Sequence, residues 1–351
     1  MKATEREIQL LNSLYDGRRV FHGELHDHSA SGGRSDGKRS LSHWRGAMEA
    51  LQMDFAAILD HHQVRHMYLP EWEDGVFIGG TEPGLHHIVD IPVEKNGLHY
   101  NMIFEGPKPL EELLSEFEEF KFTGGPEGEF AYPDFTTARF CELIQAVKEK
   151  GGFFVYPHPK QVAVSENPLH YWFCDEIAME VFYVSMDSQY TVENYALWTD
   201  LLALGKRVWA SAGCDKHACA QDTALTTIYA EEKKNAAYIA HLRVGDFVCG
   251  PIGIRMCIGD TKMGGKCQFG DRLVISVGDF HRSVKDPSHR YRLDILDENG
   301  VVAQYALGCE ETSYFALDTD PARKFYRVEV FDETRDLRIA IGNPIWNSQL
   351  L

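Results

Sequence analysis

Three segments in the first part of the chain share one pattern, in which a stretch with helical spacing of apolar residues precedes a short apolar run. The helical spacing predicts an amphipathic helix, and the apolar run predicts a buried strand. The helix–strand pairs are residues 41–52 and 55–59, residues 136–150 and 153–156, and residues 191–203 and 208–212. Repeated helix–strand units predict a parallel α/β barrel or sheet.

The pattern changes after about residue 245, where apolar and polar residues alternate and no helical spacing intervenes. Turn sequences such as residues 298–300 separate the alternating runs. The expected strands are residues 273–277, 291–296, 301–307, 326–331 and 337–341. We therefore expect a small antiparallel β domain of the sandwich type over residues 245–351, after a larger domain over residues 1–244.

Metal-binding side chains follow the predicted strands of the larger domain, where the strands end. The carboxyl ends of parallel strands meet at one edge, and barrels of this kind build their active sites there. In extended backbone, residues two apart point to the same side, so His26 and His28 can hold one ion. Asp215 and His217 form a second such pair. The candidate ligands are His26, His28, Asp36, His61, Glu82, His99, His158, Asp215 and His217.

These nine candidates are six imidazoles and three carboxylates, a mixed nitrogen and oxygen set that suits zinc, manganese or iron. Nine ligands exceed what one ion needs, so we expect two or three divalent metal ions. Glu82 follows an apolar run and can bridge two of them. The roles of five further histidines stay open, and His86 or His87 is an alternative to His99 as a ligand. The five are His22, His62, His66, His86 and His87.

Net charge and composition indicate which classes of binding partner to expect. The chain has 351 residues and a net charge of −18, which argues against a nucleic-acid partner and against an anionic membrane surface. No run of apolar residues is long enough to span a membrane, and residues 1–15 contain no secretory stretch. The eight cysteines are scattered without a CxxC pair, which is typical of reduced thiols in a cytoplasmic protein. We expect a small-molecule substrate.

The ordered motifs of this region resemble those of the polymerase-and-histidinol-phosphatase (PHP) superfamily of metal-dependent phosphoesterases. The similarity covers about residues 20–220 and is nearest to the CehA/McbA-like, or carbaryl-hydrolase-like, metallohydrolase branch. Glu24 stands where an aspartate is usual, and Cys214 replaces the usual serine. The motifs are residues 23–29 (GELHDHS), 35–37 (SDG), 59–61 (LDH), 80–82 (GTE), 157–159 (PHP) and 215–217 (DKH).

The resemblance implies a distorted (β/α)7 PHP barrel, a two- or three-metal centre, ligand roles for the nine candidates and a bridging role for Glu82. The expected activity is hydrolysis of a small phosphate ester by a hydroxide held between the ions. Lys160, directly after His158-Pro159, is the preferred contact for phosphate or leaving group. His62 is either a proton donor or a support for the ligands.

Two alternatives use the same residues differently. A hydrolase of carboxyl esters or carbamates would need the same metal centre with an apolar, aromatic pocket, and an aromatic cluster keeps this alternative open. A non-catalytic binding protein stabilised by its metals would need fewer ligands than the sequence offers. The aromatic residues are Tyr171, Trp172, Phe173 and Tyr183.

Overall fold

The structure is a computed structural model, and it describes residues 2–85, 98–120, 134–162 and 165–351. His86 and His87 lie outside the described residues. Over the described part of the chain, no helix is both long and apolar enough to cross a membrane.

Helices are concentrated in the first 245 residues, as the hydrophobic pattern predicts. The α-helices are α1 (Glu5–Leu14), α2 (Leu41–Leu51), α3 (Pro107–Glu116), α4 (Thr137–Glu149), α5 (Pro159–Val162), α6 (Gln189–Ala203) and α7 (Asn235–Leu242). The 3₁₀ turns are η1 (Arg65–Tyr68), η2 (Glu118–Phe120) and η3 (Pro168–Tyr171). The side chains of Ser40, Thr136 and Ser188 cap α2, α4 and α6, because each accepts a hydrogen bond from a first-turn backbone N–H.

Strands occur along the whole chain. Those of the first half are β1 (Arg19–Asp27), β2 (Phe55–Ile58), β3 (Phe77–Thr81), β4 (Gly84–Leu85), β5 (Leu98–His99), β6 (Asn101–Phe104), β7 (Phe153–Tyr156), β8 (Ile177–Tyr183), β9 (Val208–Gly213) and β10 (Thr226–Ala230). Those of the second half are β11 (Phe247–Cys249), β12 (Ile252–Ile258), β13 (Thr261–Lys262), β14 (Lys266–Cys267), β15 (Leu273–Phe280), β16 (Tyr291–Asp297), β17 (Gly300–Leu307), β18 (Ser313–Leu317), β19 (Phe325–Asp332) and β20 (Leu337–Asn347). The three predicted helix–strand pairs are thus α2–β2, α4–β7 and α6–β9.

A mixed α/β architecture is confirmed, but the distorted (β/α)7 barrel is not. β1, β2 and β3 are parallel, as are β7, β8 and β9, yet β6 runs antiparallel between β3 and β7. No ladder between named strands closes the path among the described residues. Instead, an isolated bridge joins Asp27 at the end of β1 to Lys216 beyond β9. The end of β1 and the segment after β9 therefore meet beside the candidate ligands.

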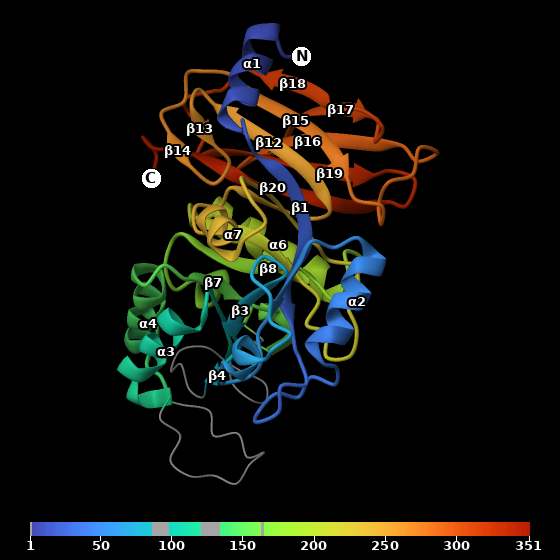
Figure 1. Cartoon of the computed structure of the whole chain (residues 1–351). Coiled ribbons are helices and arrows are strands. Elements are labelled where there is room, and N and C mark those ends of the chain that lie inside the picture. The colour runs from blue at the N-terminus through green and yellow to red at the C-terminus, as the bar shows by residue number, and fades with distance from the viewer. Residues whose placement is uncertain (1, 86–97, 121–133, 163–164) are drawn as a thin grey trace.

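The large sheet continues from β1 into the second half of the chain. It has 14 strands in the order β17-β16-β19-β20-β11-β10-β1-β2-β3-β6-β7-β8-β9, with β14 beside β20. A separate four-stranded sheet, β13-β12-β15-β18, lies with β16, β17, β19 and β20 at the top of Figure 1. Because the large sheet crosses residue 245, the division into residues 1–244 and 245–351 stays a prediction.

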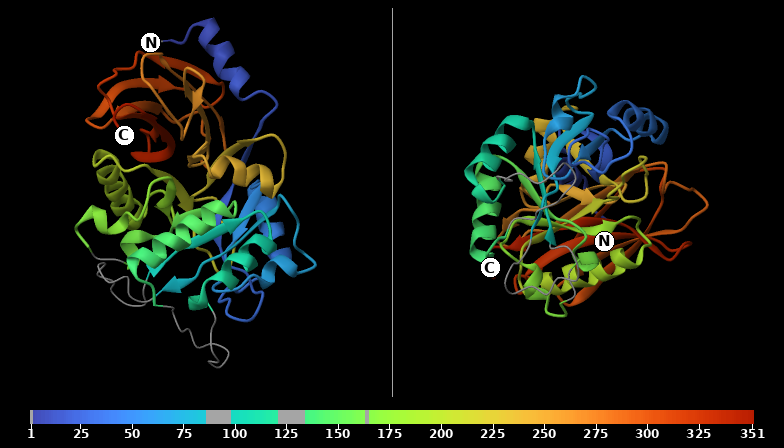
Figure 2. Two further views of the ribbon diagram at one scale, coloured as in Figure 1. Left: turned by 90° about the vertical axis from the view of Figure 1, so that its left-hand side faces the viewer. Right: turned by 90° about the horizontal axis from the view of Figure 1, so that it is seen from below.

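The N-terminal helix lies on the C-terminal strands, far from α3 and α4 (Figures 1 and 2). Lys2 forms a β-bridge with Phe315, and Glu7 forms an ion pair of 2.8 Å with Arg272. α2, α3 and α4 surround the opposite half, into which β1 descends (Figure 1). The chain thus has a β-rich end and a helix-covered end, and the candidate ligands belong to the second.

Candidate metal centre

The ends of four strands supply five of the nine candidate ligands. His26 lies in β1 and His28 follows that strand, while His61, Glu82 and His158 come just after β2, β3 and β7. The remaining candidates come from β5, from the segment beyond β9 and from the segment before α2. The structure brings all nine together in three overlapping groups, within each of which the ligand atoms lie within 4.8 Å of one another. The groups are His28, Asp36, His61 and His217; His26, His28, Glu82 and Asp215; and Glu82, His99 and His158.

Glu82 lies at the centre of the cluster, and its side chain is only 1% exposed. Its carboxylate faces five imidazoles and belongs to two of the three groups. The shortest ring-nitrogen distances to its oxygens are 3.2 Å for His26, 3.1 Å for His28, 3.4 Å for His61, 2.9 Å for His99 and 2.9 Å for His158. A carboxylate so placed can contribute one oxygen to each of two ions.

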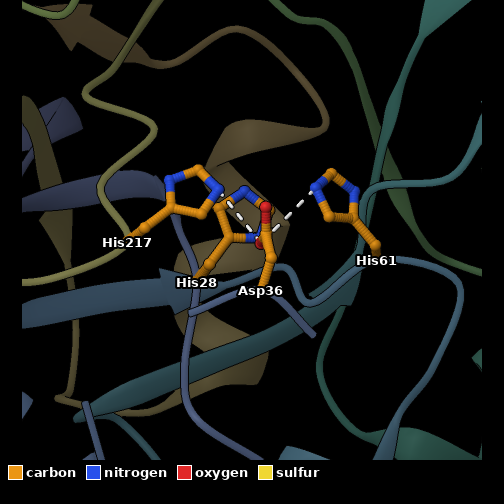
Figure 3. Close-up of side chains that lie close together, drawn as sticks. All are labelled: His28, Asp36, His61 and His217. Atoms are coloured by element: carbon orange, nitrogen blue, oxygen red, sulfur yellow. Dashed lines mark ion pairs between the residues drawn. The ribbon is translucent and has the colours of Figure 1, made fainter. Parts of the chain in front are cut away.

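The group around Asp36 forms the open side of the centre (Figure 3). Asp36 Oδ1 lies 3.1 Å from His217 Nε2 and 3.7 Å from His61 Nε2. The side chains of Asp36 and His217 are 46% and 32% exposed, whereas His28 is fully buried. This side of the cluster is therefore the one that solvent reaches.

Four buried atoms test whether the cluster fits metal ions. His26 Nε2, His28 Nε2, Glu82 Oε2 and Asp215 Oδ1 have no hydrogen-bond partner among the described residues. Yet they converge, with nitrogen–oxygen distances from 3.1 to 3.6 Å. Buried polar atoms without partners are costly, and a shared divalent cation would satisfy all four at once. The donor set therefore fits a divalent metal ion.

The electrostatics of the metal-free cluster point the same way. Burial alone lowers the pKa of His28, but the close contacts of its ring with the Asp215 and Glu82 carboxylates, and the negative charges of these groups, raise it to about 9. For Glu82, burial raises the pKa, and the charges of His26 and other neighbouring histidines depress it well below its usual range. Without metal, protons on His26, His28 and His158 neutralise the carboxylates, and metal binding would displace them.

Three residues of this region have left-handed backbone conformations, which are rare for residues other than glycine. They are His62, His158 and Asp215, with φ values of 51°, 30° and 53°. Such conformations persist only where surrounding contacts hold them, and they concentrate at functional sites. The prolines on either side of His158 restrict its neighbours, as the sequence predicts.

Residues beneath the ligands are also buried and polar. Glu24 and Asp27 lie on the ligand strand β1 and are inaccessible to solvent, as is Cys214. Burial raises the pKa of Glu24 to about 8, so its carboxyl group holds a proton at neutral pH in the metal-free protein. The two departures from the PHP motifs, Glu24 and Cys214, thus interact with each other and leave the nine candidates in place.

Two contacts of the candidate ligands were not predicted from the sequence, although Tyr183 was named among the aromatic residues that keep the ester alternative open. Glu180 accepts a hydrogen bond of 2.7 Å from His26 Nδ1, and the Tyr183 hydroxyl donates one of 2.8 Å to Asp215. One sign of the Glu180 contact is present in the sequence, which has a glutamate within the apolar run that forms β8. A charged residue in a buried strand needs a partner, but the sequence does not show which one.

The two predicted catalytic side chains outside the ligand set have partners of their own. Lys160 Nζ donates hydrogen bonds to the Ser165 carbonyl at 2.9 Å and to the Tyr171 hydroxyl at 3.4 Å. His62 Nε2 accepts a hydrogen bond of 3.1 Å from the Gly84 backbone N–H. Burial, with the charge of neighbouring groups, lowers the pKa of His62 to about 3, so its ring is neutral at physiological pH.

Comparison with family models gives no match, and comparison with curated proteins gives none. Among solved structures, the chain is similar to a two-domain protein from Bacteroides vulgatus that contains a predicted PHP-like metal-dependent phosphoesterase. The identity is 13%, the TM-score is 0.42, and the similarity covers 94% of this chain and 96% of that one.

Two structures of endonuclease Q are also similar. The enzyme from Pyrococcus furiosus, a lesion-specific endonuclease, has 14% identity and a TM-score of 0.42, with 64% of this chain and 56% of that chain covered. A complex of endonuclease Q with a 27-mer duplex substrate has 13% identity and a TM-score of 0.43, with 64% and 57% covered.

The exclusion of nucleic acid as a partner is corrected by this last structure, which holds an abasic lesion of its duplex at the active site. The exclusion was drawn from the net charge of −18. Net charge describes the whole chain, whereas binding depends on the local field, and bound divalent cations reverse the sign of that field in a carboxylate-rich site. Net charge therefore does not decide this question.

Proposed function

We propose that this protein is a metal-dependent hydrolase, and that its substrate is a small phosphate ester. The convergence of the nine candidate ligands in three overlapping groups carries this proposal. Two or three divalent ions, of zinc, manganese or iron, would be held by these residues. A cluster this large exceeds what is needed to stabilise a fold, which argues against a purely structural role.

Charge supports a phosphate ester over a neutral ester. The cluster contains three carboxylates, Asp36, Glu82 and Asp215, and three divalent ions would leave it with net positive charge even when a bound hydroxide and the adjacent Glu180 carboxylate are counted. An anionic phosphate group would be attracted to such a site. The exposed side chains of Asp36 and His217 mark the side from which the substrate would approach.

When bound, divalent ions lower the pKa of water towards neutrality and polarise an ester oxygen. The chain's own residues arrange this chemistry. Glu82 holds two groups of ligands together, and the buried rings of His26 and His28 exclude bulk water from the inner side. The neutral ring of His62 and its bond to Gly84 support its role as a fixed neighbour of the ligands.

The alternative, hydrolysis of a carboxyl ester or carbamate, would need an apolar pocket beside the ions. Tyr171 and Phe173 are buried in the hydrophobic core and do not supply one. The Trp172 ring lies under the Lys206 ammonium at 3.6 Å. Of the four aromatic residues that favoured this alternative, only Tyr183 hydrogen-bonds to a candidate ligand among the described residues.

The test compares p-nitrophenyl phosphate with p-nitrophenyl acetate as substrates of metal-loaded protein, with and without chelator. The proposal predicts turnover of the phosphate ester that stops on chelation and returns with added metal. Chelator-sensitive turnover of the acetate alone would favour the ester alternative. Turnover that is insensitive to chelator would contradict the proposal.

A further inference from the structure

Strand β8 supplies none of the nine candidate ligands, yet two of its side chains reach them. In a regular strand, Glu180 and Tyr183 would point to opposite faces, because they are three residues apart. The pairing of β8 with β9 is irregular between them: Glu180 pairs with Ser211, and Phe182 pairs with the next residue, Ala212. This bulge inserts one extra residue into β8 and turns Tyr183 to the face that Glu180 occupies.

Glu180 holds two candidate ligands at once. Its Oε1 accepts a hydrogen bond of 2.7 Å from His26 Nδ1, and its Oε2 accepts one of 2.9 Å from the His158 backbone N–H. The first bond keeps a proton on Nδ1, so Nε2, which faces Glu82 and Asp215, is the ring nitrogen that would bind an ion. The second holds His158 in its left-handed conformation.

Tyr183 selects the oxygen of Asp215 that faces the ligands. Its hydroxyl donates to Asp215 Oδ2 at 2.8 Å, while the other carboxylate oxygen, Oδ1, lies 3.1 Å from His28 Nε2. Gln161 lies beside the same hydroxyl, with its amide oxygen 2.7 Å away. The carboxylate is therefore held in one orientation before any ion binds.

Packing leaves the Glu180 carboxylate little freedom. The residue is 1% exposed, and no arginine or lysine in the described part of the chain forms an ion pair with it. Gly213 on β9 provides the space, because a β-carbon there would collide with the Glu180 carboxylate and with the β-carbon of His26. The carboxylate therefore acts on the ligands and does not neutralise a nearby cation.

We propose that Glu180 and Tyr183 are positioning residues that set the affinity for metal at two of the three ligand groups. Glu180 contacts His26 of the second group and His158 of the third, and Tyr183 contacts Asp215 of the second group. Neither contacts a member of the group around Asp36 by a hydrogen bond among the described residues. This inference rests on the proposed function, since it requires that the cluster bind metal.

The experiment measures how much Zn²⁺ the wild-type protein, Glu180→Gln and Tyr183→Phe retain in a graded series of chelator concentrations. In Glu180→Gln, one of the two accepted hydrogen bonds is lost. The affinity of two equivalents should therefore fall by roughly 10–100-fold, as for other residues that orient a ligand. Tyr183→Phe should weaken one equivalent by roughly 10-fold or less. The affinity of the equivalent held by the group around Asp36 should be the same in both variants as in the wild type.

Tyr190→Phe is the matched control. Its ring packs at 5.8 Å against that of Tyr183, but it is not a member of any ligand group. It should retain metal as the wild type does. The melting temperature of each metal-free protein separates positioning from general destabilisation, and the Co²⁺ absorption spectrum reports changes in the ligands themselves.

Selective loss of the predicted equivalents, with an altered Co²⁺ spectrum and little change in metal-free stability, is the expected result. If the wild type binds metal and all equivalents weaken equally, or in proportion to the melting temperature, the positioning role is wrong while the proposed function stands. If both variants retain Zn²⁺ as the wild type does, the positioning role is likewise wrong while the proposed function stands. If the wild type binds no metal, the proposed function and this inference both fail.

Discussion

Two buried carboxylates, Glu82 in the ligand cluster and Asp246 between α7 and β11, differ in what surrounds them. Asp246 accepts hydrogen bonds of 2.9 Å from the Tyr15 hydroxyl and from Arg18, and it forms an ion pair of 2.9 Å with Lys262. Glu82 is equally buried, but imidazoles alone face its carboxylate in ion-pair contact among the described residues.

The difference separates a structural ion pair from a binding site. Arginine and lysine carry permanent charge, so Asp246 is neutralised whatever the pH near neutrality. Imidazoles neutralise Glu82 only while they hold protons, and they exchange those protons for metal. A buried carboxylate that faces five imidazoles, as Glu82 does, is therefore the arrangement expected of a metal centre.

The largest effect should follow from Glu82→Gln, which removes the charge that two ligand groups share. Loss of metal at both groups should lower phosphate-ester turnover by about 10³-fold or more, since bound metal contributes several kcal/mol to catalysis. Elemental analysis and turnover of the same sample check this. A variant that kept full metal content and activity would remove Glu82 from the centre.

Asp246→Ala should have the opposite profile. Removal of this buried carboxylate leaves Lys262 without its ion-pair partner and Arg18 with Glu231 alone among the described residues, and this costs about 3–5 kcal/mol of folding stability. Metal content should be unchanged in the protein that remains folded. The free energy of unfolding in urea and the metal content are the two measurements. If Asp246→Ala lost metal without losing stability, the contrast between Asp246 as a structural residue and Glu82 as a metal ligand would be wrong.

His22 is a buried histidine outside the ligand groups, and it differs from the histidines that face Glu82. Burial, together with the charge of His281, lowers the pKa of His22 to about 3, although a backbone contact with Asp279 opposes this shift. The folded pKa lies below the unfolded value of 6.5, so His22 contributes stability above pH 6.5 that is lost as the pH falls towards 3.

Between pH 7 and pH 5 this loss is about 2 kcal/mol. His22→Asn keeps a polar group near Thr227, which lies 2.8 Å from His22 Nδ1, and does not titrate in this range. The free energy of unfolding of the variant should therefore fall less than that of the wild type over this range. Parallel pH profiles of the two proteins would show that His22 is not held neutral.

Lys160→Ala should give the smallest effect. The ammonium already binds the Ser165 carbonyl, so it must leave that partner to contact a phosphate group. We expect KM for p-nitrophenyl phosphate to rise by about 10-fold or less, which corresponds to about 1.4 kcal/mol. Lys108→Ala, at an exposed position of α3, is the control for a general loss of positive charge. Unchanged kinetics in Lys160→Ala would remove the predicted phosphate contact.

The candidate ligands were predictable because their chemistry and their position coincide in the sequence. His26-Asp27-His28, His158 between prolines and Asp215-Lys216-His217 all follow apolar runs, and strand ends converge in space. The helix–strand pairs were predictable from their spacing for the same reason. Local patterns determine both, and the tertiary structure then agrees with them.

Features that depend on pairing between distant segments were not predictable. A run of four residues such as β6 carries no direction, so its antiparallel placement emerges only in the structure. The roles of Glu180 and Tyr183 depend on a bulge that is defined by the register with β9. Asp246 meets Arg18, which is 228 residues away in the chain.

The central claim is that the cluster around Glu82 holds divalent metal ions, and the metal content of the protein tests it most directly. The protein would be stripped with chelator, dialysed against Zn²⁺ and analysed for bound metal beside Glu82→Gln. The account predicts two or three tightly bound equivalents in the wild type and the loss of all but one in the variant. Less than one equivalent in the wild type, or equal content in both proteins, would contradict it.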